Sequence, residues 1–92
     1  MATTLTVTLA NGVVGPSPEQ NGMVKESVVI TPNGTADGDV SAAYTPQFLK
    51  PDRVLVGGNL EYSIANGAVT FKATAAIDDN NLINADIIGY AG

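Results

Sequence analysis

The stretch NLEYSIANGAVTFKATA, residues 59–75, decides the fold because it encodes a β-hairpin. Asn66-Gly67 lies between two alternating runs, and a type I′ turn needs positive φ at both of its central positions. The two-residue loop fixes the register, since a slip of one position would turn every apolar side chain to the wrong side. The predicted pairs are Ala65–Ala68, Ile64–Val69, Ser63–Thr70, Tyr62–Phe71, Glu61–Lys72 and Leu60–Ala73.

The segments before this hairpin show the same strand chemistry. Residues 3–9 alternate between Thr and Leu or Val, residues 23–31 form a second apolar run, and residues 53–57 form a third. Clusters of Gly, Pro and Asn separate these runs with a turn about every ten residues. The pattern predicts an all-β fold, a small antiparallel β-sandwich or barrel with short loops, in a single domain over residues 1–92.

Two features of the chain interrupt this simple pattern. Pro46 suits the first turn of a short helix and Pro51 its end, so at most one helical turn is expected, near residues 46–50. Chain ends fray unless something holds them. The apolar stretch 82–92 is therefore interpreted either as a final short strand or as an extended arm, and residues 1–10 can extend in the same way.

Composition indicates that the surface of this domain meets other proteins. A chain of 92 residues is marginally stable unless a disulfide, a metal or a partner helps, and this one has no Cys and no His. Only 14% of its residues are charged, against about 25% in a typical soluble domain. Oligomerisation or docking onto a larger assembly is the remaining source of support.

The charge pattern argues against nucleic acid and membrane as partners. The net charge is −5, and the four basic residues are scattered along the sequence, at Lys25, Lys50, Arg53 and Lys72. We expect no patch that could neutralise a row of phosphates or an anionic membrane surface. No apolar run approaches the length of a membrane span, and the first residues lack a signal-peptide pattern, so synthesis in the cytoplasm is expected.

The sequence offers little catalytic chemistry. Without His or Cys the usual bases and thiol nucleophiles are missing, and we expect no enzyme, no cofactor and no small-molecule substrate. On a strand, Lys25 and Ser27 would point to one side and Glu26 to the other. We therefore interpret these residues as a solvated strand face and not as a catalytic group. An EF-hand-like loop would use Asn33, Thr35, Asp37 and Gly38 at its first, third, fifth and sixth places, but its twelfth place should be Glu and here is Tyr44. A looser calcium site would use Asp37 and Asp39. Whether these two aspartates bind calcium is left open.

The middle of the chain resembles small virion proteins of tailed bacteriophages. The features that carry the resemblance occur in the family's order: Gly38-Asp39, Thr45-Pro46, Leu49, Arg53-Val54 and the hairpin at 60–73. The resemblance covers about two-thirds of the chain through short motifs. The sequence departs from the family at 48–51, where Phe-Leu-Lys-Pro replaces a turn of the Leu-Gly-Leu kind.

The resemblance implies a structural protein of a phage particle, most specifically a capsid decoration or cement protein on the capsid exterior. Its expected partners are the major capsid protein and copies of itself, as a dimer or trimer. Strand-edge pairing and buried apolar area would supply the affinity. The residues expected to contact a partner come from both ends and the 44–51 turn: Leu5, Val7, Tyr44, Phe48, Leu49, Ile87, Ile88 and Tyr90.

Two other functions stay open on the sequence. A β-sandwich module that binds a glycan or a host surface would need an exposed aromatic platform, for which Tyr44 and Phe48 are the candidates. A head-completion or tail structural protein is a nearer alternative, and the sequence does not separate it from a decoration protein.

Overall fold

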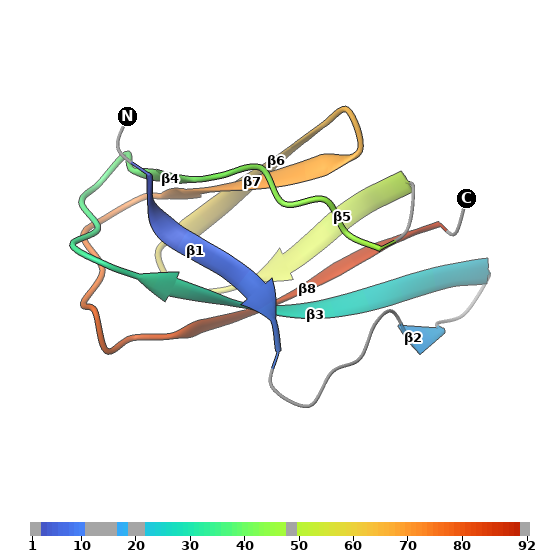
Figure 1. Ribbon diagram of the computed structural model, residues 1–92, viewed down its shortest axis with the longest axis horizontal. Helices are drawn as coiled ribbons and strands as arrows, with labels where there is room; N and C mark the ends of the chain where they lie inside the picture. The colour runs from blue at the N-terminus through green and yellow to red at the C-terminus, as the bar shows by residue number, and fades with distance from the viewer. Residues whose placement is uncertain (1–2, 11–16, 19–21, 48–49, 91–92) are drawn as a thin grey trace.

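Eight β-strands form the secondary structure, and no α-helix occurs among the residues that the structure describes. The computed structural model describes residues 3–10, 17–18, 22–47 and 50–90 (Figure 1). The strands are β1 (Thr3–Leu9), β2 (Ser17–Pro18), β3 (Met23–Pro32), β4 (Val40–Ser41), β5 (Lys50–Val56), β6 (Leu60–Ala65), β7 (Ala68–Ala73) and β8 (Ile83–Tyr90).

The predicted hairpin is confirmed in every pair. β6 and β7 pair antiparallel with Ala65 opposite Ala68 and Leu60 opposite Ala73. Asn66 has φ of 54° and Gly67 has φ of 77°, as a type I′ turn requires. Burial differs between the two strands. The inward side chains of β7 are buried, whereas Tyr62 of β6 remains 39% exposed.

The strands form one sheet that rolls up and nearly closes into a barrel, which confirms the predicted all-β class. The order is β5-β8-β3-β1-β4-β7-β6, and β2 pairs with β3 beside this path. The two strands at the ends of the order, β5 and β6, lie against each other. The pairs in the sheet are antiparallel, except that β1 and β4 run parallel over a short stretch.

Both ends of the described chain lie within the sheet. Of the two interpretations of residues 82–92, a final strand is the one found, for Ile83–Tyr90, and Thr3–Leu9 is likewise a paired strand and not an extended arm. β8 pairs with β3 on one side and β5 on the other, and β1 pairs with β3. Alternate side chains of β8 point into the barrel and are buried there. The physical reason is that an apolar strand gains more from two paired edges than from solvent.

The prediction of a helical turn near residues 46–50 is also wrong at residue 50. Lys50 and Pro51 begin strand β5, opposite Tyr90 and Gly89 of β8, and residues 48–49 lie outside the described part. Proline fits the start of a strand at the end of the sheet order because it need not donate a ladder hydrogen bond there. A bulge after Pro51 then restores the alternation of the strand.

The core fills the barrel with aliphatic side chains around Phe71, which is completely buried. Every strand of the main path except β4 contributes a buried apolar residue to it. These core residues are Leu5, Val28, Ile30, Val54, Leu60, Val69, Phe71, Ala73, Ile77, Ile83, Ala85 and Ile87.

Candidate protein-binding site

The barrel wall is split between β1 and the segment that follows β4. The parallel pairing of β1 with β4 covers only two positions, Thr3 opposite Val40 and Leu5 opposite Ser41. Beyond them the chain turns toward β7, where the Tyr44 N–H donates to the Val69 carbonyl oxygen at 2.8 Å and the Val69 N–H donates back at 2.8 Å. The second half of β1 therefore has β3 as its strand neighbour on one side and this split on the other.

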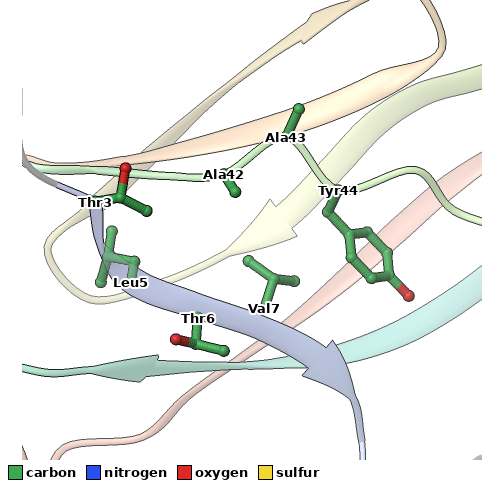
Figure 2. Close-up of a pocket in the computed structure, with 7 residues that line it drawn as sticks. All are labelled: Thr3, Leu5, Thr6, Val7, Ala42, Ala43 and Tyr44. Carbon is green, nitrogen blue, oxygen red and sulfur yellow. The ribbon is translucent and has the colours of Figure 1, made fainter.

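A cavity of about 200 Å³ occupies the split. Figure 2 shows the side chains of Val7 and Tyr44 in the gap between β1 and the 42–44 segment. The lining combines two threonines with aliphatic side chains and a tyrosine. The lining residues are Thr3, Leu5, Thr6, Val7, Ala42, Ala43 and Tyr44.

The backbone of β1 presents hydrogen-bonding groups to this cavity. The Asn33 N–H donates to the Thr4 carbonyl oxygen at 2.9 Å, and the Ala10 N–H donates to the Ser27 carbonyl oxygen at 3.0 Å. With the β1–β3 register, these bonds direct the backbone groups of even-numbered residues toward β3. The N–H and C=O groups of Val7 and Leu9 consequently point to the opposite edge, where the split lies.

A buried carboxylate fixes the far wall of the cavity. Glu26 lies on the inner face of β3 and is completely buried. Its Oε2 accepts a hydrogen bond from the Tyr44 hydroxyl, and its Oε1 accepts one from the Gln47 N–H at 3.0 Å. Burial first, and then the hydrogen bond to Glu26, raise the pKa of Tyr44 above its ordinary value. The Glu26 carboxylate thus ties the segment 44–47 to β3 across the interior.

Sequence reasoning missed this role of Glu26. The interpretation of residues 25–27 as a solvated strand face is wrong for Glu26, although Lys25 and Ser27 do point the other way. The sequence did contain a signal, because Glu26 lies on the same side of the alternating strand as Val28 and Ile30, which are core residues. A carboxylate on the inner face of a strand needs hydrogen-bond donors, because a buried charge without partners is costly.

The structure places the predicted contact residues in different parts of the molecule. Leu5, Val7 and Tyr44 come together around the cavity. Ile87 and Ile88 are buried within this chain, as is the Leu5 side chain, so they are not free to form a partner surface. Tyr90 is 45% exposed at the end of β8. Phe48 and Leu49 lie outside the described residues.

The loop that carries Asp37 and Asp39 is closed by its own hydrogen bonds. Asp39 Oδ2 accepts bonds from the Thr4 hydroxyl at 2.9 Å and from the Ala36 N–H at 3.0 Å. The Ala36 bond, followed by the Thr4 bond, holds the pKa of Asp39 below its ordinary value. Among the described residues no group of three or more acidic side chains is placed to hold a metal ion. The Asp39 carboxylate acts here as a turn cap that joins the loop to β1.

No family model, curated protein or solved structure matches this chain. Within the described ranges, no helix is both long and apolar enough to cross a membrane. A functional assignment therefore depends on the site itself and on the sequence.

Proposed function

We propose that this protein is a non-enzymatic structural protein of a tailed-phage particle, and specifically a decoration protein that stabilises the capsid from outside. The observation that carries this assignment is the split in the barrel wall, where β1 beyond Leu5 has no strand partner on this side among the described residues and borders a mainly apolar cavity. The sequence resemblance to small virion proteins supports a location on a phage particle, and the split supports a way for the protein to attach to it.

The split suits an extended segment of a partner protein. An incoming strand would pair with the backbone groups of Val7 and Leu9 and would insert alternate side chains between Val7 and Tyr44. The volume of about 200 Å³ accommodates small or medium aliphatic side chains. In the proposed particle the major capsid protein provides this segment.

The affinity of one copy for its site would be low, but many copies bound to one shell would be held together strongly. Each added backbone hydrogen bond contributes only about 0.5–1.5 kcal/mol, so a short strand gives modest affinity. A capsid presents many equivalent sites, and contacts between neighbouring copies would add avidity. A decoration protein needs only this combination of a rigid barrel and repeated contacts.

Of the two alternatives, a glycan-binding module has less support. Its expected platform included Tyr44, whose hydroxyl is bonded to Glu26 in the interior. A head-completion or tail protein would use the same type of contact, and its location on the particle distinguishes it from a decoration protein.

Labelling of virions tests this function. Tailed particles from a lysate of the source strain are purified by density and incubated with gold-labelled antibodies against the recombinant protein. We expect gold over the heads and the intact chain in the protein profile of the particles. Gold confined to tails or to the head–tail junction would favour the alternative, and absence of the chain from the particles would overturn the assignment.

A matched pair of variants tests the cavity. Ala43 lines the split, so Ala43→Trp should fill it and abolish rebinding of the protein to particles stripped of it. Ala65 is exposed at the end of β6, and Ala65→Trp adds the same side chain away from the split and from the loop at residues 33–39. Equal rebinding of both folded variants would exclude the split as the attachment site.

A further inference from the structure

Three of the four basic residues come together on the outer face of β3, β8 and β5, although the sequence scatters them. Lys25, Ile88 and Arg53 form one row across the three strands, with Ile88 between the two basic residues. The next row consists of Met23, Tyr90 and Lys50. Directly paired residues share a face of the sheet, so these side chains form one patch. We call it the cationic end.

The cationic end also carries apolar surface. Tyr90 is 45% exposed between Met23 and Lys50, while Ile88 is buried beneath its neighbours on this outer face. Two carboxylates lie nearby. Asp86 accepts a hydrogen bond from the Ser27 hydroxyl at 2.7 Å, and Asp52 occupies the bulge of β5. Among the described residues of this face the three cations outnumber these two carboxylates, in a chain whose net charge is −5.

The opposite end of the molecule is acidic. Two loops, 33–39 and 74–82, meet there through a bridge between Thr35 and Ile77 and a hydrogen bond of 2.8 Å from the Gly34 N–H to Asp79 Oδ1. The two loops contain four aspartates and no Lys or Arg: Asp37, Asp39, Asp78 and Asp79. Leu82 follows them and is 57% exposed. We call this pair of loops the acidic end.

The two ends lie at opposite extremes of the longest axis. In Figure 1 both loops are at the left, and the starts of β3 and β5 and the end of β8 are at the right. The longest extent of the molecule is 37 Å. β8 runs from just after Leu82 to Tyr90, so its eight residues separate the two exposed apolar side chains by about 26 Å at ~3.3 Å per residue.

We propose that copies of this protein associate head to tail, with the acidic end of one copy against the cationic end of the next. Aspartates of one copy face Lys50 and Arg53 of its neighbour, and Leu82 packs on the exposed ring of Tyr90. A second copy is the occupant because the chain itself contains both complementary surfaces, each with one large exposed apolar residue. A contact between different surfaces is heterologous, so it repeats and produces a ring or a filament.

Salt dependence is the first test. The mass of the purified protein is measured by sedimentation over a concentration series at about 0.01 M and about 1 M salt, between which the Debye length falls from about 30 Å to about 3 Å. We expect assemblies that grow with concentration at low salt and a monomer at high salt. A monomer at low salt throughout the series would overturn head-to-tail association.

Charge reversal then tests which surfaces meet. Lys50→Glu with Arg53→Glu makes both ends acidic, and Asp37→Lys with Asp78→Lys cancels the net charge of the four aspartates at the acidic end; all four positions are exposed. Each double variant alone should associate at least about tenfold more weakly than the wild type, because the first variant places like charges across the contact and the second removes the net charge that attracts the cationic end. An equimolar mixture of the two variants should associate again. Failure of the mixture to do so would also overturn the assignment of the two ends.

Lys72 provides the matched control. It is the fourth basic residue, exposed on β7 next to the acidic end, where it pairs with Val40, so Lys72→Glu adds negative charge beside that end and should not weaken association. Weakening by Lys72→Glu as strong as that of the double variant would show a general charge effect instead of a specific contact. These measurements require no virion, so their outcome is independent of the labelling test of the proposed function.

Discussion

Tyr44 donates its hydroxyl hydrogen to the buried carboxylate of Glu26, a residue that lies 18 positions earlier in the chain. This bond joins β3 to the segment between β4 and β5 across the barrel interior. The same tyrosine uses its backbone to pair with Val69 of β7. Tyr44 therefore holds one wall of the cavity in place from two directions.

Removal of the Tyr44 hydroxyl should destabilise the fold. In Tyr44→Phe the Glu26 carboxylate keeps the Gln47 N–H and loses its other partner. A buried charged group that loses a hydrogen bond typically costs about 1–3 kcal/mol, which we expect as a decrease in the free energy of unfolding measured with urea. Tyr62→Phe removes an exposed hydroxyl from β6 and should change stability by less than about 0.5 kcal/mol. Equal effects of the two changes would contradict the role given to the Glu26 bond.

Stability should also fall in alkali, because the folded state raises the pKa of Tyr44 above its ordinary value of 10.0. The folded protein then retains a proton that the unfolded chain loses, so this contribution is complete below pH 10.0 and decreases as the pH rises above it. Urea midpoints measured across this range should decrease for the wild type. Tyr44→Phe should lack this component, and an identical pH profile for both proteins would contradict the assignment.

Acid should weaken the loop that Asp39 closes. Hydrogen bonds from Ala36 and Thr4 lower the pKa of Asp39 below its ordinary value of 3.8. The stabilisation is therefore present above that value and is lost as the pH falls through the lower pKa of the folded state. We expect the urea midpoint of Asp39→Asn to vary less with pH between about pH 5 and pH 2 than that of the wild type. The neighbouring exposed Asp37→Asn is the control, and it should follow the wild type.

Two adjacent glycines between β5 and β6 should respond differently to the same substitution. Gly58 has φ of +67°, and a methyl group there would lie 3.6 Å from Ile83 Cδ1, whereas Gly57 has open space. The left-handed conformation costs an L-residue about 1–2 kcal/mol, so Gly58→Ala should lower the free energy of unfolding by that amount. Gly57→Ala should be close to neutral. If Gly57→Ala lowered the free energy of unfolding as much as Gly58→Ala, the explanation from the backbone conformation of Gly58 would be wrong.

Local sequence determined much of the fold. The hairpin register followed from Asn66-Gly67 and the alternation around it, and strands β1 and β3 followed from their period of two. These features depend on residues that are close in the chain, because turn chemistry and side-chain alternation act over a few positions.

Only part of the candidate site could be predicted from local sequence. Leu5, Val7 and Tyr44 were predicted to contact a partner, and they line one cavity. The cavity itself could not be predicted, since it arises where β4 leaves β1 after two paired positions and joins β7. The role of Glu26 likewise required knowing which donors reach the inner face of β3.

The sequence by itself determined strands β1, β3, β6 and β7, the Asn66-Gly67 turn and the scarcity of charge, because each depends on composition or on neighbours within a few residues. Tertiary structure alone decided that β8 lies between β3 and β5 and that Lys50 and Pro51 extend a strand. It also decided that Lys25, Lys50 and Arg53 share one face. The physical reason is that strand order depends on pairing between segments far apart in the chain, which local propensity does not specify.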